Sequence, residues 1–174
     1  MHSLVSVVWV FLLCLVFAVE SVRSPTPTLG VVVDKHSHSG FRTVALPFDD
    51  EPLLAWGSFK DSIASDGWSY LSVHSNASQS NVLQARAAGF VEGALTAQRI
   101  WEFASNHMDQ FSWSPKLRDY VCDNNKWMAE QIAAKTKSGK LEERLWWSQV
   151  KLILEQQRGL FEGYTAHAAP GQEL

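Results

Sequence analysis

The chain has 174 residues, a formal net charge of −3 at pH 7 and eight tryptophans. This length suits one ordinary domain with its own core. The mild net charge and the absence of long runs of like charge argue against a nucleic-acid partner.

The amino terminus predicts a cleavable signal peptide. Residues 4–19 are almost entirely apolar, which is typical of a signal-peptide core but short of the roughly 20 residues that span a bilayer. Small residues then suit cleavage after Ser21, so residues 1–21 are assigned to the signal peptide. His2 is the only possible positive side chain before the core, which is a weak feature of this assignment. An uncleaved anchor is the alternative, and the absence of a following basic cluster disfavours it. No second apolar segment of that length follows, so no transmembrane segment is expected in the mature, secreted chain.

The first half of the mature chain predicts strands. Residues 30–34 and 41–46 flank a turn-rich segment at 36–40, which indicates a β-hairpin. An apolar segment at 53–59 follows a polar break, and a further strand is predicted over 68–73, where the side chains alternate. These segments carry the aromatic and β-branched side chains that strands prefer.

The second half has helical periodicity. A long helix is predicted over residues 78–108, where apolar residues recur every three or four positions. A second helix begins at Ser114-Pro115, since proline suits a first helical position. A third covers 141–158, with Gly159 as its stop. Strands followed by helices predict an α+β fold.

Two features of the first helix concern its start and its packing. Asn76, Ser78 or Ser80 could cap its amino terminus. Residues 87–89 and 93–94 are alanines and glycines, so another element could approach the helix closely there.

Polar residues that could form a catalytic or metal site each have a simpler explanation. His36 and His38 could share a face, but two ligands make a poor metal site, and a solvated loop is favoured. The acidic run at 49–51 is interpreted as a polar turn, and Asp61 and Asp66 as caps and turn formers. No Gly-x-Ser-x-Gly motif occurs. No metal and no cofactor are therefore expected.

Cys122 is the one candidate nucleophile, because Cys14 would leave with the signal peptide. Its acidic neighbours Asp119 and Asp123 disfavour a reactive thiolate. An unpaired cysteine in a secreted protein suggests a buried thiol, an intermolecular bridge or a partner on a missing segment. Cys122 is interpreted as structural or bridging, so no catalytic residue is assigned.

Asn76-Ala77-Ser78 is an acceptor sequence for N-glycosylation. The tripeptide alone is a weak signal, but the signal peptide supplies the compartment in which it is modified. Asn76 is therefore expected to carry a glycan.

Several segments, taken together and in order, resemble the phospholipase B-like family from about Val31 to Tyr164. The most specific part is the glycine-tryptophan strand followed by an alanine-rich helix. The segments are DSI (61–63), GWSYLSV (67–73), Asn76 with its sequon, QARAAGFVEG (84–93), NKWM (125–128) and WWSQVKLILEQQRGL (146–160).

The resemblance implies a secreted or lysosomal glycoprotein with an amino-terminal-nucleophile hydrolase fold, in which two sheets lie between helix layers. Internal proteolysis of a longer precursor exposes a cysteine whose thiol attacks an acyl ester or amide, with its own α-amino group as the base. The substrate is expected to be a phospholipid or another acylated lipid.

The chain departs from that pattern because it resembles only roughly the first third of such a precursor. Residues 22–164 are assigned to a partial domain and 165–174 to an irregular tail. The family's nucleophile is expected beyond Leu174, so this short form is predicted to be inactive alone, with apolar faces and tryptophans exposed. The alternative is a secreted binding or regulatory fragment that associates with the catalytic portion of a full-length relative.

Overall fold

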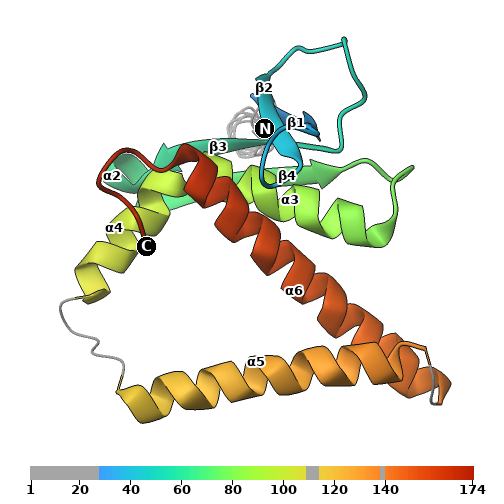
Figure 1. Ribbon diagram of the computed structural model, residues 1–174. Helices are drawn as coiled ribbons and strands as arrows, with labels where there is room; N and C mark the ends of the chain where they lie inside the picture. Colours follow the sequence, from blue (N-terminus) through green and yellow to red (C-terminus); the bar gives the residue numbers. More distant parts are fainter. Residues whose placement is uncertain (1–27, 109–113, 138–139) are drawn as a thin grey trace, which may run out of the picture.

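A computed structural model describes residues 28–108, 114–137 and 140–174 (Figure 1). The predicted signal peptide, residues 1–21, lies outside the described residues. The described chain is α+β, as predicted, with strands preceding most of the helices. Its elements are β1 (Leu29–Val33), β2 (Phe41–Ala45), β3 (Ala55–Ser62), α2 (Ile63–Asp66), β4 (Trp68–Ser75), α3 (Asn81–Leu95), α4 (Ala97–Met108), α5 (Pro115–Lys135) and α6 (Leu141–His167).

The four strands form one antiparallel sheet in the order β2-β1-β3-β4. The predicted hairpin is confirmed, with Val33 opposite Phe41 and Leu29 opposite Ala45. The predicted strand at 68–73 is also confirmed, as β4. The apolar segment at 53–59 was given no element by the sequence, yet it supplies most of β3, which pairs with both β1 and β4. Gly57 and Ser58 weaken its strand signal, and its pairing partners on both sides outweigh that propensity.

The helix predicted over 78–108 is two helices rather than one. Ser80 is the cap of the first, since its Oγ accepts a hydrogen bond from the Leu83 amide at 3.4 Å. Thr96 separates α3 from α4, and its hydroxyl donates to the Glu92 carbonyl at 2.8 Å. A threonine that bonds back to the preceding turn disfavours helix continuation, and the apolar periodicity across residue 96 hides this break.

The helix predicted from Ser114-Pro115 is confirmed as α5, with Ser114 as its cap and the Leu117 amide donating to Ser114 Oγ at 3.2 Å. The predicted stop of the third helix at Gly159 is wrong. Helix α6 continues through Gly159 to His167, so the first residues of the predicted irregular tail are helical. The glycines in this helix serve packing instead of termination.

Helix α3 lies between the sheet and α6, so the fold has three layers (Figure 1). The buried core joins strand residues such as Val31 and Ala55 to the α3 residues Phe90 and Val91. Phe41 meets Phe90 edge-to-face, with ring centroids 5.4 Å apart. The core therefore sits between the hairpin and α3, and α6 covers the outer face of α3.

Helices α3 and α6 cross in parallel at four glycines. A Cβ on Gly89 would lie 2.0 Å from the Gln156 carbonyl oxygen, and one on Gly93 would lie 2.0 Å from the Leu160 oxygen. In return, a Cβ on Gly159 would lie 2.0 Å from the Arg86 carbonyl oxygen, and one on Gly163 would lie 2.2 Å from the Phe90 oxygen. The close approach expected at 87–89 and 93–94 is confirmed, and its other half is the Gly159/Gly163 pair.

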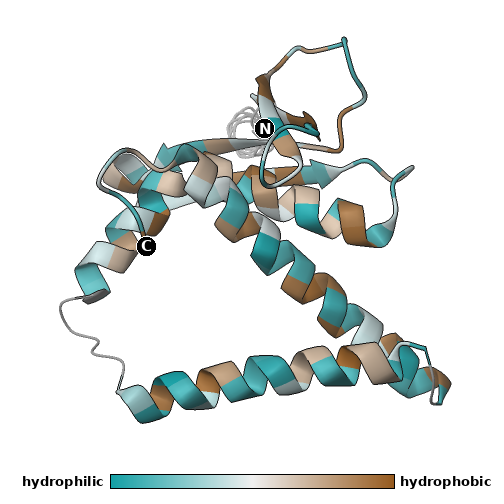
Figure 2. Ribbon diagram, viewed as in Figure 1, coloured by the Kyte–Doolittle hydropathy of each residue, from teal (hydrophilic) through white to brown (hydrophobic). Residues whose placement is uncertain are grey.

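Helix α5 and the first half of α6 project away from the sheet, and their apolar residues recur along exposed surface (Figure 2). None of the residues of α5 is buried. Trp68, Trp127 and Trp146 are 70%, 51% and 67% exposed, so the expected exposure of tryptophans is confirmed. Within the described part of the chain, no helix is both long and apolar enough to cross a membrane.

Candidate functional site

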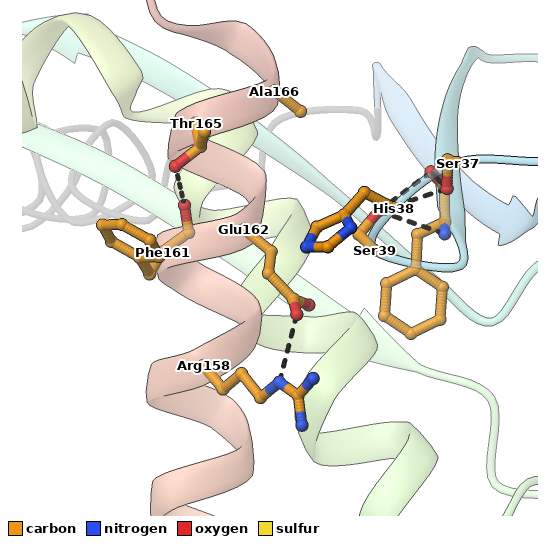
Figure 3. Close-up of a pocket in the computed structure, with 9 residues that line it drawn as sticks. Ser37, His38, Ser39, Arg158, Phe161, Glu162, Thr165 and Ala166 are labelled. Carbon is orange, nitrogen blue, oxygen red and sulfur yellow. Dashed lines mark hydrogen bonds and ion pairs between the residues drawn. The ribbon is translucent and has the colours of Figure 1, made fainter. Parts of the chain in front are cut away.

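A pocket of about 420 Å³ lies between α6 and the loop at residues 34–40, hereafter the hairpin loop. Glu162 on α6 and the His38 ring extend toward each other from the two sides (Figure 3). The pocket is lined by Ser37, His38, Ser39 and Phe41 from the hairpin side and by Arg158, Phe161, Glu162, Thr165 and Ala166 from α6.

The hairpin loop is held in shape by its own polar groups. The His36 amide donates to Asp34 Oδ1 at 2.9 Å, and Ser37 Oγ donates to the Phe41 carbonyl at 2.8 Å. Gly40 has φ +78°, a left-handed conformation that glycine adopts without strain. These contacts present His38 and Ser39 to α6.

An ion-pair network supports one wall of the pocket, where Arg158 and Glu162 are lining residues and Arg86 is their partner outside the lining. Arg86 of α3 donates from Nε and from a terminal nitrogen to the two Glu162 oxygens, at 2.9 and 2.7 Å. Arg158 Nε donates to Glu162 at 3.1 Å, and Arg86 also donates to the Ser39 carbonyl at 3.1 Å. Arg86 therefore ties α3, α6 and the hairpin loop together.

The electrostatics of this wall favour a charged Glu162. Partial burial alone would raise the pKa of the Glu162 carboxyl, but the hydrogen bonds and charges of Arg86, and then of Arg158, outweigh it and hold that pKa below its usual value. The Arg86 guanidinium also lies over the Phe41 ring, 5.3 Å from its centroid. The result is an apolar floor beside two guanidinium groups and one carboxylate.

These three charged residues were not singled out from the sequence. Arg158 and Glu162 stand four apart on one helix, a spacing that signals an ion pair. Arg86 is 76 residues from Glu162, and no local pattern links the two. The pair forms at the α3–α6 crossing, and the sequence predicted a close approach to α3 without indicating that α6 makes it.

The residues weighed as metal ligands lie in different places. His36 and His38 are both exposed in the hairpin loop, and His38 lines the pocket. Glu51 pairs with Arg42 at 2.6 Å instead of forming an acidic cluster. Among the residues described in the structure, no group of three or more His, Cys, Asp or Glu side chains could hold a metal ion.

Asp61 and Asp66 are turn formers at the β3–β4 connection, as predicted. Asp66 accepts a hydrogen bond from the Trp68 amide at 3.0 Å, and Asp61 accepts one from the Ile63 amide at 3.2 Å. Asp61 also pairs with Arg99 of α4. The hydrogen bond from Arg99, and then that from Ile63, lower the pKa of the Asp61 carboxyl.

Cys122 is an exposed free thiol on α5, away from the pocket. The sequence did not single out a different pair, Ser72 and His74, which share one face of β4. Ser72 Oγ and His74 Nε2 are 3.1 Å apart, and the His74 ring stacks on Trp56. Neither residue lines the pocket at the hairpin loop, and no carboxylate is bonded to His74 among the described residues.

Asn76 lies at the end of β4 in a turn that its own side chain closes. Its Oδ1 accepts hydrogen bonds from the Ser78 amide at 3.0 Å and from Ser78 Oγ at 2.8 Å. Its Nδ2 donates to the Leu53 carbonyl at 2.9 Å. The amide is partly exposed and uses one of its two N–H groups within the fold.

Comparison with known proteins gives a consistent result. The sequence model of the family described as Phospholipase B matches residues 55–174. The chain is 32% identical over 122 residues to phospholipase B-like protein E of Dictyostelium discoideum, covering 66% of this chain and 21% of that protein. It is 30% identical over 131 residues to phospholipase B-like protein C of the same organism, covering 72% of this chain and 22% of that protein.

The fold and these matches define an α+β chain of the phospholipase B-like class. The chain belongs to the phospholipase B family. The matched part of the chain covers about a fifth of the length of these relatives. The match includes residues 165–174, which the sequence had set apart as a tail.

Proposed function

We propose that the chain is the amino-terminal part of a hydrolase that cleaves acyl ester or amide bonds of lipids, and that it is inactive by itself. The observation that carries this proposal is the family match over residues 55–174, with relatives named phospholipase B-like. The substrate is a phospholipid or another acylated lipid.

The proposed chemistry uses a cysteine that internal cleavage makes the first residue of a second chain. Its thiol attacks the acyl carbonyl while its α-amino group takes the thiol proton and passes it to the departing alcohol or amine, which breaks the ester or amide bond and leaves a thioester. Water then hydrolyses the thioester, which releases the acid and restores the thiol. Cys122 does not suit this role, because it lies in the middle of α5. We propose that the nucleophile lies in another part of the family's chain, as the family resemblance implies.

The arrangement of the sheet supports an amino-terminal-nucleophile hydrolase fold. Gly57 turns toward α3, since a Cβ there would meet Val91 and Leu95. Side chains alternate along a strand, so Trp56 and its cross-strand neighbour His74 lie on the opposite face. We propose that a second sheet, supplied by the rest of the family's chain, packs against this face.

The first test is a hydrolysis assay on the purified chain. We expect no release of fatty acid from phosphatidylcholine vesicles above the buffer rate, because the chain lacks the nucleophile, and no change in the Cys122→Ser variant. Fatty acid released by the wild type and lost in Cys122→Ser would overturn the proposal and make Cys122 the nucleophile.

The second test supplies the missing portion in trans. The exposed Trp127 and Trp146 favour association with another chain, because large exposed apolar surfaces mark interaction sites. Co-expression with the catalytic portion of a full-length relative is expected to give a complex that co-purifies and hydrolyses phosphatidylcholine. A complex without hydrolysis would favour a binding or regulatory fragment. Separate elution of the two chains would contradict both functions.

We also propose that the chain enters the secretory pathway, is secreted or delivered to the lysosomal lumen, and carries a glycan on Asn76. Expression in eukaryotic cells is expected to give a band that shifts by one glycan after peptide-N-glycosidase treatment. Ser78→Ala should abolish the shift while leaving the Asn76–Leu53 hydrogen bond available, and Ser78→Thr should keep it. An unshifted wild-type band would contradict the assignment.

A further inference from the structure

We propose that the pocket at the hairpin loop binds a single carboxylate attached to an apolar chain, such as a medium-chain fatty acid. The binding of such a ligand is argued from the residues of the pocket alone. That the ligand is a product of deacylation rests on the proposed function. The site uses residues from α6 and the hairpin loop, and it includes neither Cys122 nor the Ser72–His74 pair.

The ion-pair network at the wall of the pocket carries one net positive charge. Arg158 and Glu162 line the pocket, and Arg86 pairs with Glu162 without lining it, so the network contains two guanidinium groups and one carboxylate. One positive charge is left over. A monoanion would balance the wall, whereas a dianion would exceed it.

Arg158 supplies the donors. An arginine has five N–H donors in a planar fork that fits a carboxylate. Within the described residues, the hydrogen bond from Nε to Glu162 is the one recorded for Arg158, so its two terminal nitrogens are available. The Arg158 side chain is 61% exposed, so it reaches a ligand without disturbing the core.

The rest of the lining suits an apolar chain. Phe41 forms a buried floor, and Phe161 and Ala166 add apolar surface. The hydroxyl hydrogens are already used: Ser37 Oγ donates to the Phe41 carbonyl, and Thr165 Oγ1 donates to the Phe161 carbonyl at 2.9 Å. These hydroxyls therefore do not compete with Arg158 for the anion.

The volume of the pocket fits a small ligand. About 420 Å³ lies within the range of roughly 300–1,000 Å³ typical of small-molecule sites, which are mostly apolar with a few polar groups that fix orientation. The charged wall would hold the head group, and the floor would hold the chain. A medium-chain carboxylate meets both requirements.

The test is titration of the purified chain with decanoate below its micelle concentration, followed by calorimetry and amide chemical shifts. Decanoate is expected to bind at residues of the hairpin loop and α6. Arg158→Gln should weaken binding about tenfold, since a charge-assisted bidentate contact is lost. Ala166→Phe should abolish it by filling the pocket.

The matched control is Arg144→Gln, which removes the same charge from an exposed position on the same helix and should leave decanoate binding unchanged. Decanol should bind at least about tenfold more weakly than decanoate. Equal binding of decanol, equal binding by Arg158→Gln, or tighter binding of decyl phosphate would each overturn the proposal.

The binding test and the hydrolysis test fail separately. Decanoate binding needs no nucleophile, so it can be measured on a chain that hydrolyses nothing. Decanoate binding without hydrolysis by the reconstituted complex would support the proposed carboxylate site and contradict the proposed hydrolase function. Hydrolysis without decanoate binding would do the reverse.

Discussion

Gly93→Ala is expected to destabilise the fold by about 3 kcal/mol, near the upper end of overpacking costs. The added methyl carbon would lie 2.0 Å from the Leu160 carbonyl oxygen and 2.8 Å from the Tyr164 amide nitrogen. Both atoms belong to the backbone of α6, so no side chain can move aside and the helices must separate. The higher helix propensity of alanine, about 1 kcal/mol, offsets only part of this cost.

Urea unfolding followed by circular dichroism measures the effect. With a slope of about 2 kcal/mol/M, the midpoint should fall by about 1.5 M. Gly40→Ala is the control: its methyl group meets nothing within 4 Å, and its left-handed backbone should cost only about 1 kcal/mol. Equal midpoints for Gly93→Ala and the wild type would refute the crossing.

Glu162→Ala is expected to cost about 2 kcal/mol. The side chains of Arg86 and Glu162 are only 22% and 15% exposed, so truncation leaves a half-buried guanidinium without its carboxylate. Breaking a fully buried pair costs about 3–5 kcal/mol, and the partial exposure here reduces that figure. Glu51→Ala, which removes the partner of Arg42 from an exposed pair, should cost only about 0–1 kcal/mol.

The same carboxylate makes stability depend on pH. Because Arg86 and Arg158 lower the pKa of folded Glu162 below the unfolded value of 4.5, its contribution is complete above pH 4.5 and is lost as the pH falls through the folded pKa. Unfolding curves between pH 7 and pH 3 should show this loss in the wild type and a smaller one in Glu162→Gln. Identical pH profiles for the two proteins would contradict the network.

Local signals predicted several elements correctly. The hairpin followed from two apolar runs around a turn-rich loop, and the start of α5 followed from Ser114-Pro115. Ser80, the cap of α3, was one of three candidate caps for that helix. Such features depend on residues adjacent in the sequence, so the sequence alone suffices.

Features that depend on distant contacts were missed or misjudged. Glycine often ends a helix, so Gly159 was predicted as a stop. In the structure, its lack of a side chain instead allows α6 to pack closely on α3. Helix α3 ends at Thr96, although the helical spacing of apolar residues continues past this position. Arg86 and Glu162 meet only after α6 packs on α3, and nothing near either residue in the sequence links the two.

The parallel crossing of α3 and α6 also bears on the order in which the chain can fold during synthesis. All four strands and α3 precede α6 in the sequence, so they can leave the ribosome before the helix that covers the outer face of α3. Until Gly159 and Gly163 emerge, the backbone of α3 at Gly89 and Gly93 is exposed, because no side chain covers it there. The nascent domain is therefore expected to expose this backbone to chaperones, and to lose this exposure abruptly when α6 docks.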